Sequence, residues 1–208
     1  QLILVAVPQA GAPKAYKAWE GGKIDFGNPT ESAFLQTKFR IEALRNGHSS
    51  IFDYIRNQPI VSIQELLPVY GFLSTATTSL QYPNGHPGNL FLQSLISNFS
   101  KVLQRVRITS IAGDVTPSTT PGRYTITPST EEPKWEHGEP ISTLLVPGDG
   151  TVLRHSNEFL ISLDDNRFLN IDHTQVVTAS AAYIFQKLNH IEPGAVIGAE
   201  FGGDGAAA

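Results

Sequence analysis

VPGDGTV at residues 146–152, followed downstream by IDHT at residues 171–174, decides how this chain is interpreted. The first stretch places the carboxylate of Asp149 in a glycine-rich turn, and the second places His173 between an apolar strand and a helix. Both positions fit side chains delivered from the ends of successive strands. An Asp–His pair alone is a base without a nucleophile, so the pattern predicts a pair that activates a third group.

The composition is that of a globular protein and argues against several functional classes. With 208 residues, of which 40% are hydrophobic, the chain is long enough to bury one sizeable core. The net charge of −4 and the absence of a Lys/Arg run argue against a nucleic-acid surface. No apolar stretch reaches the roughly 18 residues of a membrane span. With zero cysteines, the sequence has neither a disulfide framework nor a thiolate zinc site.

The two ends predict that the chain is a piece of a longer protein. It contains no methionine, and the apolar run at 2–7 starts directly after Gln1, with no cap or signal peptide before it. Residues 191–208 finish in a Gly/Ala-rich segment, which resembles a linker to a further module.

Apolar runs alternate with amphipathic stretches, which predicts an α/β fold. We expect strands at 2–7, 107–112, 142–146 and 167–171, a hairpin arm at 124–127, helices at 31–46, 50–57, 62–65, 90–106 and 176–188, and irregular surface segments at 19–29 and 74–89. The first strand is apolar throughout, as in a parallel sheet covered on both faces. The connection over about residues 14–105 is long enough to predict a lid or cap.

Aromatic residues are frequent in this long connection, and their role stays open at this point. They either line an apolar pocket for an acyl chain or form the core of a cap domain. The residues concerned are Phe34, Phe39, Phe52, Tyr54, Tyr70, Phe72, Tyr82 and Phe91.

Several motifs resemble the α/β-hydrolase fold and, within it, the lecithin–cholesterol acyltransferase-like lipases. VAVPQAGAP at 5–13 is similar to the family's strand after the nucleophile helix, although Gln9 replaces the usual His and Val7 the usual Thr. SIQELLP at 62–68 is similar to the lid segment of the family. DGTV at 149–152 is similar to the catalytic-acid turn, and His173 falls where the family has its catalytic histidine. The resemblance spans residues 1 to about 190.

The resemblance implies the C-terminal part of an α/β-hydrolase domain over residues 1–190, with a mostly parallel sheet, flanking helices and a helical lid insertion. Asp149 would orient the base, and His173 would act as general base and then general acid. No Gly-x-Ser-x-Gly elbow occurs in the sequence, so the nucleophile and the oxyanion hole would lie upstream. The implied activity is that of a serine esterase, lipase or acyltransferase on acyl esters or lipids. It needs no metal or organic cofactor, and it requires the N-terminal half of the domain as partner.

Other interpretations of the same residues remain open. Asp149 could simply form a turn, His173 could cap the last helix, and Asp114, just after the second long strand, is a rival acid. Asp149 in a Ca²⁺ loop is disfavoured, because the turn lacks alternating oxygen ligands. The other histidines are scattered and predict no metal site, although His155 stands beside the acid turn. At the level of the whole protein, the alternative is a non-catalytic surface or interaction module. The tail and the resemblance suggest a secreted or cell-surface protein.

Overall fold

A computed structural model describes residues 1–25, 29–57, 61–131, 133–160 and 166–189. Its elements in order are β1 (Leu2–Val5), α1 (Lys14–Gly21), α2 (Pro29–Arg45), α3 (Ile51–Asn57), α4 (Val61–Glu65), β2 (Leu73–Ser74), α5 (Leu90–Leu103), β3 (Ile108–Gly113), β4 (Thr120–Thr127), β5 (Glu139–Val146), α6 (Arg154–Glu158), β6 (Asn166–Leu169) and α7 (Val176–Leu188). The expected tail at 191–208 lies outside the described residues.

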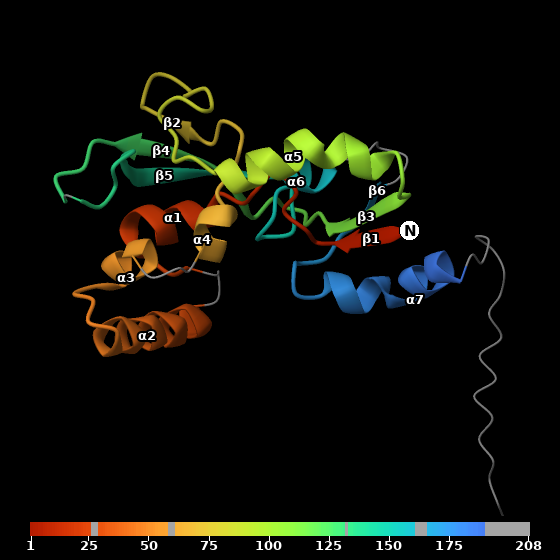
Figure 1. Cartoon of the computed structure of the whole chain (residues 1–208), viewed down its shortest axis with the longest axis horizontal. Coiled ribbons are helices and arrows are strands. Elements are labelled where there is room, and N and C mark those ends of the chain that lie inside the picture. The colour runs from red at the N-terminus through yellow and green to blue at the C-terminus, as the bar shows by residue number, and fades with distance from the viewer. Residues whose placement is uncertain (26–28, 58–60, 132, 161–165, 190–208) are drawn as a thin grey trace, which may run out of the picture.

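The first sheet is parallel; the loop that carries His173 follows its strand β6, and Asp149 lies against the end of its strand β3. Its strand order is β1-β3-β6, and β3 is buried along its whole length because it lies in the centre. Helices α6 and α7 pack against β3, and Figure 1 shows α7 on one side of this sheet and α5 on the other. The structure is therefore mixed α/β, with parallel strands and flanking helices.

A second sheet has the order β2-β4-β5. The hairpin arm expected at 124–127 and the strand expected at 142–146 fall within β4 and β5, whereas a separate sheet was not expected from the sequence. β4 and β5 form an antiparallel hairpin, and the two-residue strand β2 runs parallel to β4. The sheet covers a core in which the rings of Tyr16, Phe72 and Tyr124 are fully buried. Tyr16 donates a hydrogen bond to the carbonyl of Gly138 over 2.6 Å, which ties α1 to the hairpin.

The expectation of a surface excursion at residues 19–29 is wrong for its first part. Trp19 and Glu20 belong to α1, and both Glu20 and Ile24 are buried. The helix stops at Gly22, which adopts φ 64° and so accepts the left-handed conformation that ends many helices. Helix α1 could not be recognised from the sequence, because no side chain caps its start and the glycines Gly21 and Gly22 stand at its end.

In the described part of the chain, both edges of the parallel sheet and two helix faces are uncovered. Among the described strands, β1 pairs with β3 alone, so its other edge has no partner strand. On α5 the side chains of Leu90, Phe91 and Leu95 are more than half exposed, and α7 exposes Phe185 in the same way. Uncovered strand edges and apolar helix faces promote association.

We therefore expect the 208-residue chain, produced alone, to dimerise or aggregate. The driving force is pairing at the outer edge of β1 and burial of the apolar faces of α5 and α7. Size-exclusion chromatography with light scattering measures this directly. A monodisperse monomer with cooperative unfolding would contradict the prediction.

Candidate functional site

The turn after β5 fixes the carboxylate of Asp149. Its Oδ1 accepts hydrogen bonds from the backbone N–H groups of Thr151 (3.0 Å) and Val152 (2.7 Å), and its side chain is fully buried. Gly150 adopts φ 85°, which a residue with a Cβ rarely does. The local sequence thus aims the second carboxylate oxygen, Oδ2, away from the turn.

His173 lies in the loop between β6 and α7 and forms two hydrogen bonds with Asp149. Its Nδ1 is 2.9 Å from Oδ2 of Asp149, and its backbone N–H donates to the carbonyl of Asp149 over 2.9 Å. Because Oδ2 is a carboxylate oxygen, the neutral imidazole carries its proton on Nδ1 and leaves a lone pair on Nε2. The histidine side chain is 35% exposed, so this nitrogen can be reached from outside the core.

The end of β3 leaves room for this pair because it finishes in Gly113. A Cβ on Gly113 would lie 2.3 Å from the carbonyl oxygen of Ile171 and 2.6 Å from Cβ of Asp149. Real Cβ atoms do not approach other atoms so closely. The glycine therefore allows the acid turn and the histidine loop to close over the strand end.

A cavity of about 240 Å³ adjoins His173. Most of its wall is apolar and comes from the segment after β1, from α1 and from the segment around α4. Lys14 and Asp25 add charged groups to the wall. Burial lowers the pKa of Lys14, an effect that Asp25 and Asp149 oppose and Lys17 reinforces. The lining residues are Ala6, Pro8, Ala12, Lys14, Ala15, Ala18, Asp25, Ile63, Leu66, Thr151, Val152 and His173.

No family model matches this chain, and no curated protein matches it either. Within the described ranges, every helix is too short or too polar to cross a lipid bilayer.

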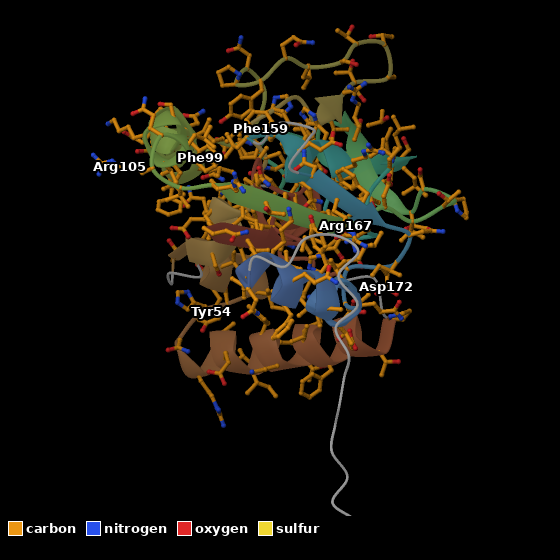
Figure 2. All side chains as sticks on the ribbon, turned by 90° about the vertical axis from the view of Figure 1, so that its right-hand side faces the viewer. Tyr54, Phe99, Arg105, Phe159, Arg167 and Asp172 are labelled. Atoms are coloured by element: carbon orange, nitrogen blue, oxygen red, sulfur yellow. The ribbon has the colours of Figure 1, made fainter. Side chains whose placement is uncertain are left out.

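The rival acid, Asp114, is engaged elsewhere. Its Oδ2 is 3.1 Å from Nη1 of Arg154, which also pairs with Glu158. Asp172 lies next to His173 in sequence, but its carboxylate accepts hydrogen bonds from Thr174 at the surface, near the start of α7 (Figure 2). Among the described acidic residues, Asp149 alone is hydrogen-bonded to the ring of His173.

Three of the remaining histidines have structural contacts away from this site. His155 packs its ring edge-on against Tyr70 and Phe159. His86 is buried, its Nε2 accepts from two backbone N–H groups, and burial lowers its pKa. His48 pairs with Asp53 at 3.3 Å. His190 lies outside the described residues.

The cavity wall answers the question about the aromatic residues. None of the eight aromatic side chains of the long connection lines the cavity beside His173, so of the two open alternatives this cavity does not support an aromatic acyl pocket. Phe72 instead belongs to the buried core, where Tyr70 packs against it, and Phe52 is buried as well. Phe34 and Phe91 are exposed.

Two polar residues tie the segment after β1 to β3 and to the region of α6. Gln9 is buried and donates to Ser110, while its carbonyl oxygen accepts from the backbone of Leu160. Ser156 is fully buried, accepts from the N–H of Ala10 and donates to the carbonyl of Gly11. The side-chain amide of Gln9 thus serves internal hydrogen bonding. Both residues hold neighbouring segments in place, and neither is hydrogen-bonded to His173.

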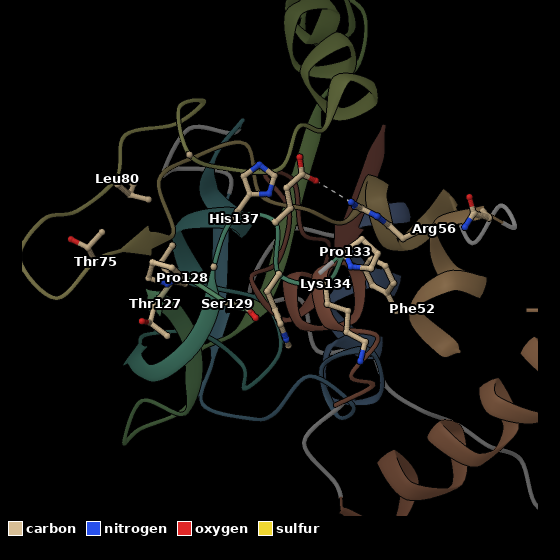
Figure 3. A pocket seen from close by; sticks show the side chains of 16 residues that line it. Phe52, Arg56, Thr75, Leu80, Thr127, Pro128, Ser129, Pro133, Lys134 and His137 are labelled. Atoms are coloured by element: carbon tan, nitrogen blue, oxygen red, sulfur yellow. Dashed lines mark hydrogen bonds and ion pairs between the residues drawn. The ribbon is translucent and has the colours of Figure 1, made fainter. Parts of the chain in front are cut away.

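A second cluster, formed by Glu20, Glu136 and His137, lies away from the Asp149–His173 pair and escaped sequence reasoning. It borders a larger cavity of about 880 Å³, into whose wall Arg56 and His137 are built (Figure 3). Glu20 raises the pKa of His137, an effect that burial of the imidazole opposes. No local sequence signal points to this cluster, because 117 positions separate Glu20 from His137.

Proposed function

We propose that Asp149 and His173 are the acid and the base of a Ser–Asp–His triad in a serine esterase, lipase or acyltransferase of the α/β-hydrolase type. The observation that carries the proposal is the buried carboxylate of Asp149, held by two backbone N–H groups and hydrogen-bonded to a histidine that lines an apolar cavity. The nucleophilic serine and the oxyanion donors come from a part of the hydrolase domain outside this chain.

In this mechanism the lone pair on Nε2 of His173 accepts the proton of the serine hydroxyl as that oxygen attacks the ester carbonyl. The imidazolium that forms carries protons on both nitrogens, and the carboxylate of Asp149 stabilises it through Nδ1. The Nε2 proton then passes to the leaving alcohol as the acyl-enzyme forms. Water, or an acceptor alcohol in an acyltransferase, repeats the sequence to release the acyl group.

The surrounding fold supports the same proposal. The acid and the base follow β5 and β6, late elements of the chain, in the order that the hydrolase fold uses after its serine. The outer edge of β1 is where further strands of such a sheet would pair. The segment at 62–68 borders the cavity through Ile63 and Leu66, as a lid over an acyl site would do.

The cavity suggests an acyl chain of medium length. A volume of about 240 Å³ holds roughly eight groups of the size of a water molecule or a methylene, taking about 30 Å³ for each. The mostly apolar wall suits a hydrocarbon chain, and Lys14 and Asp25 leave part of the wall for a polar portion of the substrate. We therefore propose acyl esters as the substrate class.

Replacing Leu66 by tryptophan is expected to shift the preference toward shorter acyl chains. Leu66 lines the cavity and is 39% exposed, so the larger ring can enter the cavity without disturbing the core. We expect the ratio of kcat/KM for p-nitrophenyl octanoate to that for the acetate to fall about tenfold. An unchanged ratio would show that this cavity does not bind the acyl chain.

The first test of the whole proposal is hydrolysis of p-nitrophenyl esters by the full-length protein, with variants of the pair alongside. Activity that depends on both residues supports the triad. A folded full-length protein without esterase or acyltransferase activity would contradict it.

A second candidate is a non-catalytic interaction module on the same scaffold. It is favoured by one observation: no serine or threonine hydroxyl among the described residues is hydrogen-bonded to Nε2 of His173. The sequence of the segment upstream separates the two candidates. A strand followed by Gly-x-Ser-x-Gly and a helix supports the enzyme, whereas an unrelated domain or a degraded elbow supports the module.

A further inference from the structure

The cluster of Glu20, Glu136 and His137 contains a buried carboxylate whose charge is incompletely compensated. Glu20 is 1% exposed, and its Oε2 accepts a hydrogen bond from the backbone N–H of His137 over 3.2 Å. Its Oε1 is buried and accepts no hydrogen bond. Nδ1 of His137, which is also buried and without a hydrogen bond, lies 3.3 Å from this Oε1. At this separation the two atoms form an ion pair without hydrogen-bond geometry, and a cation that replaces the Nδ1 proton would contact both of them.

The local backbone is built to bring these side chains together. Trp135 is buried and adopts φ 58°, a conformation that is costly for a bulky residue. Its N–H donates to the backbone carbonyl of Glu20 over 2.8 Å, and its own carbonyl accepts from Gly138 over 2.8 Å. This turn therefore places Glu136 and His137 next to the end of α1.

We propose that Glu20, Glu136 and His137 bind a divalent transition-metal ion, Zn²⁺ in the first place. Tetrahedral zinc with bonds of about 2.0–2.1 Å to nitrogen and oxygen holds neighbouring ligand atoms about 3.4 Å apart. The 3.3 Å between Oε1 of Glu20 and Nδ1 of His137 equals such an edge. One ligand atom from each of the three residues lies within 4.8 Å of the others, so a small rotation of the exposed Glu136 completes a three-ligand site. One imidazole and two carboxylates suit zinc better than the hard cations, which prefer oxygen alone.

Arg56 is the competing cation. Its guanidinium lies 3.7 Å from Oε1 of Glu20 and 3.2 Å from Oε2 of Glu136, where it offsets part of the negative charge (Figure 3). Arg56 also stacks on the rings of Trp19 and Phe52 and lines the cavity of about 880 Å³. The cavity gives the metal ion a path of entry and gives the guanidinium room to withdraw while it keeps its ring contacts.

The bound ion would join two parts of the fold that are distant in sequence. Glu20 belongs to α1, whereas Glu136 and His137 lie between β4 and β5. A metal ion between them fastens the helical insertion to the second sheet. This role is separate from the Asp149–His173 pair and does not depend on the proposed catalysis.

Isothermal titration of the metal-free full-length protein with ZnCl₂ tests the proposal. We expect one equivalent that is lost in His137→Ala and weakened about tenfold or more in Glu136→Gln, together with a rise in Tm of the wild type on zinc addition. Arg56→Gln removes the competing cation, so its Tm without metal should fall while its zinc affinity rises. The matched control is His48→Ala, because His48 faces Asp53 at the same 3.3 Å with no third metal ligand beside it.

Tetrahedral coordination has its own signature, the visible d–d absorption of Co²⁺ bound in place of zinc. The absorption should appear in the wild type and in His48→Ala and be absent in His137→Ala. Equal zinc stoichiometry in the wild type, His137→Ala and Glu136→Gln would overturn the proposal. Zinc binding that weakens in Arg56→Gln would also overturn it and would leave a buried ion-pair network in its place.

Discussion

Replacing His173 by alanine or Asp149 by asparagine is expected to lower kcat/KM for p-nitrophenyl ester hydrolysis by about three or more orders of magnitude, with folding intact. Alanine at position 173 removes the nitrogen that takes the serine proton. The measurement is made on the full-length protein, with circular dichroism and thermal unfolding of each variant as the check on folding.

The effect of Asp149→Asn follows from the hydrogen bonds of the acid turn. Oδ1 accepts from two backbone N–H groups, those of Thr151 and Val152, so the amide oxygen of asparagine must take this place. The amide NH₂ then faces Nδ1 of His173 and donates to it. That contact moves the imidazole proton to Nε2, where the reaction needs a lone pair. The variant therefore keeps the fold of the site, but its His173 carries the proton on Nε2 and cannot act as the base.

Asp114→Asn is the matched control, because Asp114 is an acid near the same sheet edge that pairs with Arg154 and not with His173. We expect its activity to stay within a few-fold of the wild type. If Asp149→Asn is tolerated and Asp114→Asn is not, the acid has been misassigned. If all variants retain full activity, the pair is not catalytic.

Gly113→Ala should cause the largest loss of stability among single-methyl additions near the site. The new Cβ would stand 2.3 Å from the carbonyl oxygen of Ile171 and 2.6 Å from Cβ of Asp149, and neither neighbour is the far end of a flexible side chain. Overpacking of this kind typically costs about 1–3 kcal/mol, and backbone contacts place the expected loss at the upper end or above it. Because the acid turn and the histidine loop are the parts that must move, ester hydrolysis should fall as well.

Urea unfolding of the full-length protein measures the free-energy change, and Gly88→Ala serves as control. An added Cβ on Gly88 meets no atom within 4 Å, so the control tests the cost of losing a glycine without the steric contact. Equal unfolding midpoints for the two variants would show that the strand end adapts to the added methyl group and that Gly113 is not needed to close the site.

The sequence was most informative where the signal is local. The glycine-flanked Asp149, and a histidine between a strand and a helix, can be recognised from a few neighbouring residues. Helix α7 was predicted with the observed bounds because its apolar residues recur at helical spacing.

Features set by distant contacts could not be predicted in the same way. β2 has two residues and exists only because Leu73 and Ser74 pair with β4. The cavity beside His173 combines small residues from the segment after β1 with Ile63 and Leu66, so aromatic content was a poor guide to it. Likewise, nothing near His137 in the sequence indicates that Glu20 lies beside it. Such features depend on tertiary packing, which overrides local propensity.

The backbone hydrogen bond from His173 to the carbonyl of Asp149 has a consequence for experiment. Together with the side-chain contact, it closes a ring through both residues, so thermal fluctuations displace the acid and the base as one body. Opening this ring must break both bonds, which should protect the His173 amide from hydrogen–deuterium exchange. That one amide resonance would report whether the pair is assembled, with no substrate present.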